Sequence, residues 1–371
     1  MKTAIILTSI FEPDYLKIYE QNLLESGIEN DEVCFIVIGD NKTPHESYRK
    51  IQCSLKYPLF YLSPIDQKYW INDNKLKIDS VVVPENSSRR RNIGYLFAMQ
   101  TGFDNYIVID DDNLPVKGTN WLRSHISALT RSSNKITVSS KNKYVNPCAY
   151  TKSNTSLLYA RGYPISEYFK DTFFAQSIQD CNVVDVNTAL WVDDPDIDAG
   201  FHLLYDNVKS ISVDNKSFVI GYNNYIPINS QNTMYSKRIS PIFWNVHQPN
   251  VLDVSLDRFD DIWNGLFISK VLHRIGGSVS FGNPVVLHKR NSHNYNKDFK
   301  KEHIASIINC ELWNYISKEI DVYSSNVIDC YREIATELCL FTKYENDYIN
   351  EAINEIGDSM IKWTNAVEQL C

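Results

Sequence analysis

The chain has 371 residues, which is enough for one large domain or two of ordinary size. Hydrophobic residues make up 43% of the sequence and aromatic residues 12%, a composition typical of a globular protein with a sizeable core. The formal net charge of −8 argues against a nucleic-acid groove as the main binding surface.

Cysteine usage and apolar runs indicate a cytoplasmic protein. The eight cysteines are scattered without CxxC or Cys/His zinc spacing, so free thiols in a reducing cytosol are the simplest interpretation. The apolar residues 1–10 lack a signal-peptide cleavage region and are better interpreted as a buried strand. No apolar run reaches the ~20 residues that span a bilayer. We therefore expect a cytoplasmic location and no transmembrane segment.

Strand-like and helical patterns alternate along the first third of the chain. This alternation predicts an α/β fold with a mostly parallel central sheet, flanking helices and ligands at the carboxyl ends of strands. Loops are expected over much of residues 136–235, and helical periodicity dominates from about residue 303. The strands are predicted at residues 4–9, 33–38, 57–62 and 106–109, and the helices at residues 14–26 and 88–100.

Three consecutive carboxylates, Asp110, Asp111 and Asp112, follow the apolar run at residues 106–109. Because strand side chains alternate between faces, Asp110 and Asp112 are predicted to point one way and Asp111 the other. Hard oxygen ligands at a strand end suit Mg²⁺ or Mn²⁺, and a site with open positions can also hold a diphosphate. A solvated acidic turn is the alternative interpretation.

An arginine run opens the helix predicted at residues 88–100. Helix N-termini attract anions, and guanidinium groups bind phosphate through paired hydrogen bonds. Alone, Arg89, Arg90 and Arg91 would be a solvated basic patch. Because the acidic triplet follows about one helix later, the arginines and the triplet together suggest a nucleoside-diphosphate site.

Three later segments carry further candidates. The acidic residues 193–198 surround a proline, where they form a solvated turn or accept hydrogen bonds from sugar hydroxyls. Asp260 and Asp261 open an amphipathic helix, where they favour the helix dipole or act as a functional pair. His288 ends an apolar strand and precedes Lys289 and Arg290, so it is either structural or a metal ligand beside phosphate binders.

In this order the segments resemble a nucleotide-sugar-dependent glycosyltransferase of the GT-A fold. In that family an Asp-x-Asp motif at a strand end holds a divalent cation on the donor diphosphate. A later acidic pair opens a helix, and a late His often completes the metal shell. The matching positions are Asp110 and Asp112, then Asp260 and Asp261, then His288.

The sequence is also similar to two particular groups: the plant reversibly glycosylated polypeptides, which are UDP-arabinopyranose mutases, and the STELLO-type glycosyltransferase-like proteins. Both likenesses include the acidic triplet and the Arg-Asn-Ile-Gly-Tyr segment at residues 91–95, although Asn113 stands where the plant mutases have Cys. They span about residues 1–300, which we predict to be a GT-A-like catalytic domain followed by a helical extension at residues 301–371. The mutases are matched further at residues 161–166, 190–191 with 195–199, 258–263 and His288. The STELLO type is matched further at residues 194–199, 229–233, 261–263 and 289–291 with 293–295.

The resemblance implies roles for individual residues. Asp110, Asp112 and His288 would ligate Mn²⁺ or Mg²⁺. Asp260 or Asp261 would be the general base or bind the acceptor, and Arg161 matches the arginine that becomes glycosylated in the mutase group. The nucleotide sugar would contact Thr8, Asp40, Arg91, Asp110, Asp111, Asp196, Asp198 and Lys289.

These features lead to three hypotheses. The first is metal-dependent transfer of a sugar from a nucleotide-sugar donor, with UDP as the expected nucleotide, to a saccharide acceptor in surface polysaccharide synthesis. The second is a UDP-sugar mutase that interconverts pyranose and furanose forms. The third is a non-catalytic glycosyltransferase-like scaffold. The C-terminal helices would suit a homodimer interface, an acceptor-docking surface or plain packing onto the catalytic domain.

Overall fold

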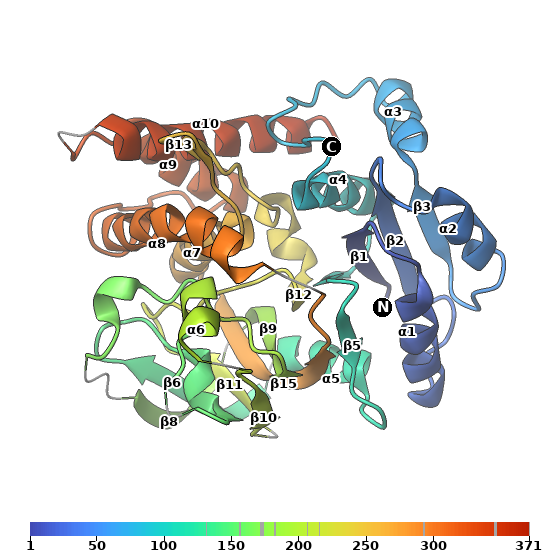
Figure 1. The fold of residues 1–371 in the computed structure, drawn as a ribbon, viewed down its shortest axis with the longest axis horizontal. Helices are drawn as coiled ribbons and strands as arrows, with labels where there is room; N and C mark the ends of the chain where they lie inside the picture. The colour runs from blue at the N-terminus through green and yellow to red at the C-terminus, as the bar shows by residue number, and fades with distance from the viewer. Residues whose placement is uncertain are drawn as a thin grey trace.

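The expected α/β fold is confirmed in the computed structural model: a large central sheet is flanked by helices (Figure 1). The structure describes residues 1–130, 132–155, 157–170, 174–181, 183–205, 207–214, 216–291, 294–344 and 347–370.

The central sheet has the strand order β3-β2-β1-β4-β12-β9-β15-β11-β6-β8. Short strands β5, β7 and β10 pair at its margins, and β13 and β14 form a separate ribbon. The strand bounds are β1 Thr3–Ser9, β2 Val33–Gly39, β3 Leu59–Leu62, β4 Asn105–Ile109, β5 Asn113–Pro115, β6 Ser132–Ser140, β7 Thr151–Ser153, β8 Phe174–Cys181, β9 Val184–Asp193, β10 Ser210–Val213, β11 Ser217–Ile220, β12 Asn232–Ser236, β13 Asn250–Val251, β14 Val254–Ser255 and β15 Ser278–His288.

Most strands around the centre of the sheet run in one direction. β3, β2, β1 and β4 are parallel neighbours, and their continuous apolar runs are typical of strands that are covered on both faces. β12 is antiparallel to both β4 and β9, so β9 and its parallel partner β15 return to the direction of β4. The carboxyl ends of β1, β2, β4, β9 and β15 therefore meet at one edge of the sheet, where open α/β sheets bind their ligands.

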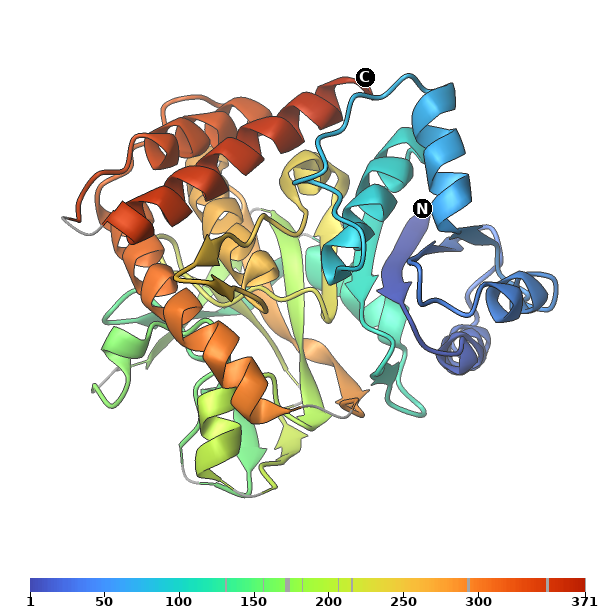
Figure 2. The same cartoon turned by 45° about the horizontal axis from the view of Figure 1, so that its top comes forward.

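Helices cover the sheet, and the C-terminal pair α9 and α10 packs together beyond it (Figure 2). α10 reaches the chain that follows α3, where Lys362 pairs with Asp79 at 3.2 Å and Gln369 accepts a hydrogen bond from the amide of Lys77. None of the helices in the described ranges is long and apolar enough to cross a membrane. The α-helix bounds are α1 Asp14–Glu25, α2 His45–Gln52, α3 Pro64–Asp73, α4 Asn92–Thr101, α5 Trp121–Leu129, α6 Ala199–Leu204, α7 Asp260–Ile275, α8 Tyr295–Lys318, α9 Val327–Cys339 and α10 Asp347–Glu368.

Two expectations from the sequence are refined by the structure. The helix predicted at residues 88–100 begins with a 3-10 turn, η1 (Ser88–Arg91), and only then continues as α4. The segment at residues 136–235, expected to be loop-rich, also contributes β7 to β11 and parts of β6 and β12 to the fold. These strands pair with partners far away in the sequence, which local patterns do not reveal. The division at residue 300 stays a prediction.

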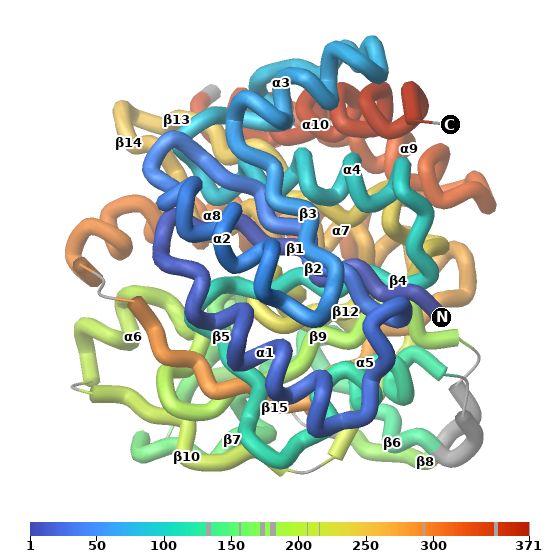
Figure 3. Tube along the Cα trace, turned by 90° about the vertical axis from the view of Figure 1, so that its right-hand side faces the viewer, coloured from blue at the N-terminus to red at the C-terminus, as the bar shows by residue number. Residues whose placement is uncertain are grey.

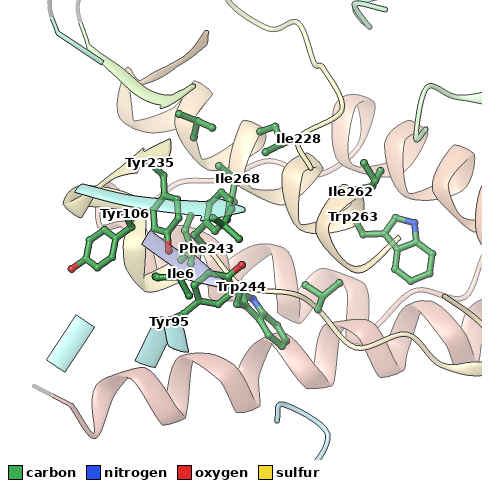
Figure 4. Close-up of a cluster of buried hydrophobic side chains, with 14 of the residues drawn as sticks. Ile6, Tyr95, Tyr106, Ile228, Tyr235, Phe243, Trp244, Ile262, Trp263 and Ile268 are labelled. Atoms are coloured by element: carbon green, nitrogen blue, oxygen red, sulfur yellow. The ribbon is translucent and has the colours of Figure 1, made fainter. Parts of the chain in front are cut away.

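Aromatic side chains pack together in the core between β4, β12 and α4. The ring of Tyr235 on β12 stacks on Tyr106 of β4 at 5.3 Å and on Phe243 at 3.9 Å, and Tyr95 of α4 packs against the same group (Figure 4). Many of the chain's aromatic residues are thus core residues. Among the side chains that the structure describes, the free thiols are those of Cys34, Cys53, Cys148, Cys310, Cys330 and Cys339.

Candidate functional site

A pocket of about 340 Å³ opens at the carboxyl edge of the parallel strands. The ends of β1 and β2, the loop before η1 and the turn between β4 and β5 form its walls. Six of the predicted site residues line it, together with residues that the prediction did not include. The lining residues are Thr8, Ser9, Ile10, Asp40, Lys42, Asn86, Ser87, Ser88, Arg91, Asp110, Asp111, Asp112 and Asn291.

The first carboxylate of the acidic triplet is paired with an arginine. Asp110 follows β4 directly and forms an ion pair with the buried guanidinium of Arg91. A second nitrogen of Arg91 donates to the carbonyl oxygen of Ser230 at 3.3 Å, while its Nε has no partner. Burial raises the pKa of Asp110, and the charge of Arg91 opposes that rise. The predicted phosphate binder and the predicted metal ligand are therefore direct neighbours.

The second carboxylate also lines the pocket. Asp111 accepts hydrogen bonds from the hydroxyl of Ser9 at 2.5 Å and from the amide nitrogen of Asn291 at 3.2 Å. Burial raises its pKa to about 6, although the Ser9 hydrogen bond acts in the opposite direction. The predicted alternation of faces is wrong here, because the triplet forms a turn after β4 and all three carboxylates border the same pocket.

The third carboxylate faces the predicted histidine. Nε2 of His288 lies 3.7 Å from Oδ1 of Asp112, and Nδ1 of His288 lies 2.7 Å from the carbonyl oxygen of Asp194. Since a carbonyl only accepts, Nδ1 carries the proton and Nε2 is directed at Asp112. The backbone amide of Asn291 donates to the carboxylate of Asp112 at 3.1 Å, and the backbone amide of Lys289 donates to the backbone carbonyl oxygen of Asp112 at 2.8 Å.

The predicted metal ligands are only partly assembled. In the described ranges, no three His, Cys, Asp or Glu side chains are grouped as a metal site would require. Asp112 and His288 are close together, whereas Asp110 is engaged by Arg91. A histidine whose Nδ1 donates to a carbonyl while Nε2 faces a carboxylate is the usual arrangement of a metal-binding imidazole. Asp112 and His288 are therefore the two residues best placed to hold a divalent cation.

Thr8 and Asp40 lie at the other side of the pocket. The hydroxyl of Thr8 donates to the carbonyl oxygen of Ile38 at 2.7 Å, which joins the ends of β1 and β2. The carboxylate of Asp40 accepts hydrogen bonds from the amide of Asn41 at 2.7 Å and the amide of Ser87 at 3.1 Å. Asp40 thus holds the loop that carries Asn86, Ser87 and Ser88 against the pocket.

Arg161 is at the centre of a buried ionic cluster, with a side chain only 5% exposed. Its Nε and Nη2 donate to Asp196 at 2.8 and 2.9 Å, and its Nη1 and Nη2 donate to Asp261 at 3.0 and 3.3 Å. Nη1 also donates to the carbonyl oxygen of Arg258. These contacts use all five N–H groups of the guanidinium. Burial would lower the pKa of Arg161, but the two carboxylates raise it well above its usual value.

The two acids that open α7 have different surroundings. Asp261 accepts hydrogen bonds from Arg161, from the amide and hydroxyl of Ser230 at 2.8 and 3.1 Å, and from the amide of Ile262 at 2.9 Å. Asp260 is buried and accepts a hydrogen bond from the side chain of Asn245 at 3.0 Å. Burial and the neighbouring Asp261 raise the pKa of Asp260 to about 6.

A second acidic pair lies on the other side of Arg161. Asp198 precedes α6 and accepts a hydrogen bond from the hydroxyl of Tyr168 at 2.6 Å, while its other oxygen has no partner. The buried Glu302 of α8 forms an ion pair with Arg258 and accepts the amide of Ala199 at 2.6 Å. Burial, followed by the charge of Glu302, raises the pKa of Asp198 to about 7.

The structure therefore sorts the predicted residues into two groups. Thr8, Asp40, Arg91 and the acidic triplet line the pocket, whereas Arg161, Asp196, Asp198, Asp260 and Asp261 form the buried cluster beside it. Ser230, which the prediction missed, connects the groups because it contacts both Arg91 and Asp261. Its signal was the Asn-Ser-Gln-Asn-Thr segment at residues 229–233, which the sequence resemblance had included.

Two cations differ from expectation. Lys289 is exposed, and its backbone amide donates to the backbone carbonyl oxygen of Asp112. Arg90 is buried away from the pocket, where it donates to the side chain of Gln67 and the carbonyl oxygen of Val83, both at 2.7 Å. Asn291 was missed as a site residue although it lies within the matched segment after His288. Only Arg91 of the arginine run lines the pocket.

The chain belongs to the reversibly glycosylated polypeptide family, whose model matches residues 63–371. A curated relative, the "Probable UDP-arabinopyranose mutase 4" of Arabidopsis thaliana, is 23% identical over 222 residues, which are 57% of this chain and 54% of that protein. The match thus spans about half the length of that relative.

Similar solved structures have low sequence identity. A mycobacterial protein is 11% identical with a TM-score of 0.40, over 84% of this chain and 75% of that one. The mannosyltransferase PcManGT of Pyrobaculum calidifontis, solved with GDP-Man and Mn²⁺, is 9% identical with a TM-score of 0.40, over 100% and 84%. Residues 1–349 of TarS from S. aureus, solved with UDP-GlcNAc, are 12% identical with a TM-score of 0.35, over 96% and 71%.

Proposed function

We propose that this chain is a glycosyltransferase that moves a sugar from a nucleotide-sugar donor to a saccharide acceptor. The observation that carries the proposal is the pocket at the carboxyl edge of the sheet, where the acidic triplet and Arg91 face Thr8 and Asp40. A cation site beside a guanidinium suits a diphosphate, and the opposite wall suits a nucleoside. The expected nucleotide is UDP, as in the name of the Arabidopsis relative.

A divalent cation, Mn²⁺ or Mg²⁺, is part of the proposal. Asp112 and His288 would hold it, because their facing atoms and the fixed imidazole orientation fit a cation ligand pair. When bound, the cation would neutralise charge on the leaving diphosphate. Arg91, already beside Asp110, would bind the same diphosphate and could exchange its partner for a phosphate oxygen.

Asp260 is the proposed general base. The oxygens of Asp261 are occupied by Arg161, Ser230 and the amide of Ile262, which suits a positioning role. Asp260 accepts fewer hydrogen bonds, and its pKa of about 6 allows it to be ionised at neutral pH and still take a proton from an acceptor hydroxyl.

A nucleotide-sugar mutase is the second candidate, and family membership and the Arabidopsis relative favour it. In the arginine-linked form of that reaction, Arg161 would receive the sugar. Its guanidinium is buried, strongly protonated and bonded through all five N–H groups, so attack on a sugar would first require the cluster to break. This geometry supports a positioning role for Arg161 and therefore the transferase.

The proposal is tested in two stages. The first is calorimetric binding of UDP, CDP, GDP and CMP with Mn²⁺ and with a chelator; we expect one diphosphate to bind with a marked metal dependence. The second incubates the matching radiolabelled nucleotide sugars with and without saccharide acceptors. Label in an extended saccharide supports the transferase, whereas isomerised donor without acceptor, or label on the protein at Arg161, supports the mutase. Absence of binding by every nucleotide would leave the non-catalytic scaffold as the better description.

The homodimer expected from the sequence stays a prediction. Light scattering, which gives the molar mass of the chain in solution, tests it.

A further inference from the structure

Large apolar side chains are exposed on two elements next to the site. Leu203 and Leu204 of α6 are 44% and 76% exposed, Phe299 of α8 is 46% exposed, and Phe169 after η3 (Ile165–Glu167) is 77% exposed. α6 and the beginning of α8 lie next to each other in two perpendicular views (Figures 1 and 3). We call these four residues, with the lysines named below, the α6–α8 surface.

Contacts between these elements connect the exposed apolar residues, in part through the buried ring of Phe201. Gly200, Leu203 and Leu204 are spaced i, i+3 and i+4, so they share one face of α6. A methyl group at Gly200 would lie 3.3 Å from Cε2 of Phe299, so the Phe299 ring packs directly on that face. On the other side, Phe201 of α6 contacts Tyr168 with ring centroids 5.5 Å apart, and Tyr168 contacts Phe169 at 6.2 Å.

Phe169 has an unusual backbone. Its φ angle is +59°, a left-handed conformation that is unfavourable for a bulky side chain. The rings of Tyr159 and Tyr168 pack against this segment, and the hydroxyl of Tyr159 accepts a hydrogen bond from the backbone amide of Phe169 at 2.7 Å. The fold thus keeps a large apolar ring in solvent at the expense of backbone strain, which points to an external partner.

Exposed lysines lie on the same segment as Phe299, although the chain as a whole is acidic. Lys289, Lys297 and Lys300 are exposed on the segment that leads from His288 into α8, whereas the formal net charge of the chain is −8. Of the acids on the same part of α8, Glu302 is buried and paired with Arg258, and Asp298 is half-buried and acts on the same arginine. The fully exposed charges of this segment are therefore those of the lysines. Exposed Leu and Phe bordered by Lys are the side chains of a protein face that lies in a lipid interface.

We propose that the α6–α8 surface docks peripherally on an anionic lipid bilayer. Phe169, Leu203, Leu204 and Phe299 would enter the interface, and Lys289, Lys297 and Lys300 would meet anionic headgroups. Because Asn291 lines the pocket and α8 begins four residues later, docking would place the pocket beside the membrane. The proposal stands on the surface itself and does not depend on the proposed transfer reaction.

Vesicle flotation tests the proposal on the full chain. We expect the protein to float with vesicles that mix phosphatidylcholine and phosphatidylglycerol, much less with phosphatidylcholine alone, and less at high salt because the lysine contribution is screened. F169S/L204S and K297E/K300E should each lower the bound fraction about tenfold or more. I65S/Y69S on α3 changes residues that are 62% and 64% exposed, and K50E/K75E makes the same charge change; both controls should float like the parent chain.

Circular dichroism and thermal unfolding establish that each variant is folded. Failure of the parent chain to float with anionic vesicles overturns the proposal, as does undiminished flotation of F169S/L204S. Light scattering distinguishes another occupant: a dimer that is lost in F169S/L204S, without any flotation of the parent chain, would assign the surface to a second copy and reject the membrane.

Discussion

Nε2 of His288 lies 3.7 Å from Oδ1 of Asp112, although the two residues are 176 positions apart in the sequence. The pairing of β5 with β15 explains this proximity, because the residue after Asp112 is the direct partner of His288 in the ladder. The sheet itself thus places an imidazole opposite a carboxylate at the pocket.

Metal binding provides the first prediction. D112N and H288A should each lower the affinity for Mn²⁺ by about 10- to 100-fold or more, because each removes one proposed ligand. Calorimetric titration of Mn²⁺, alone and with UDP, measures this. D193N is the matched control, since Asp193 opposes His288 in the β9–β15 ladder but pairs with Lys209 at 2.7 Å. Unchanged Mn²⁺ affinity in both D112N and H288A would refute the ligand pair.

The Arg91–Asp110 pair provides the second prediction. R91M should abolish tight diphosphate binding and lower the free energy of unfolding by about 3 kcal/mol, because Asp110 loses its partner while mostly buried. R91M/D110N should recover much of that stability without recovering nucleotide binding. Urea unfolding and calorimetry measure the two effects separately. Diphosphate binding by R91M at the affinity of the parent chain would contradict the role of Arg91.

Arg161 is predicted to act by positioning. R161M removes the main cationic partner of Asp196 and Asp261 and should lower the free energy of unfolding by about 3–5 kcal/mol. R161K should lose less stability because it keeps the charge, but it cannot satisfy both carboxylates in a planar fork. The readout is urea unfolding together with KM and kcat on the parent and R161K. A stability loss below about 1 kcal/mol in R161M would contradict the cluster, because breaking a buried pair costs more than that.

Asp198 should make the stability of the protein depend on pH. Burial and Glu302 raise its pKa from 3.8 to about 7 in the folded state, so the folded chain holds a proton that the unfolded chain releases. Its contribution is full below about pH 4 and is lost as the pH rises through about 7. The other groups around it are Tyr168, Arg161, Asp196 and Cys148.

The substitution D198N removes this titration. Above pH 7 we expect D198N to be more stable than the parent chain, by at most about 4 kcal/mol, and the two chains to converge near pH 4. Chemical unfolding of both proteins at a series of pH values gives the difference curve. A flat difference between pH 4 and 8 would mean that Asp198 is ionised throughout.

Gly162 provides a steric test next to Arg161. Its φ angle is +89°, and a methyl group there would lie 2.3 Å from Cγ2 of Ile262 on α7. Gly102 also has a positive φ, +80°, but a methyl group there would meet nothing within 4 Å. G102A should therefore cost about 1–2 kcal/mol from backbone strain alone, and G162A clearly more. Equal losses in the thermal or urea unfolding of the two variants would show that Ile262 can move aside.

The sequence by itself determined the parallel strands and the chemistry at their ends. Continuous apolar runs specify buried strands, and carboxyl ends of parallel strands share one edge, so the acidic triplet was expected at a ligand site there, whereas Asp40 was assigned through the family resemblance. The helix α7 could also be predicted, because apolar residues with helical spacing follow Asp260 and Asp261. These are local patterns, and their meaning does not depend on distant residues.

The tertiary structure alone decided which side chains meet. Arg91 engages Asp110, Arg161 is saturated by Asp196 and Asp261, and Ser230 connects the pocket to that cluster. Each of these contacts depends on the strand order and register of the sheet, which bring together residues 19 to 139 positions apart. Periodicity and composition carry no information on such pairings, because they are selected by the packing of the whole chain.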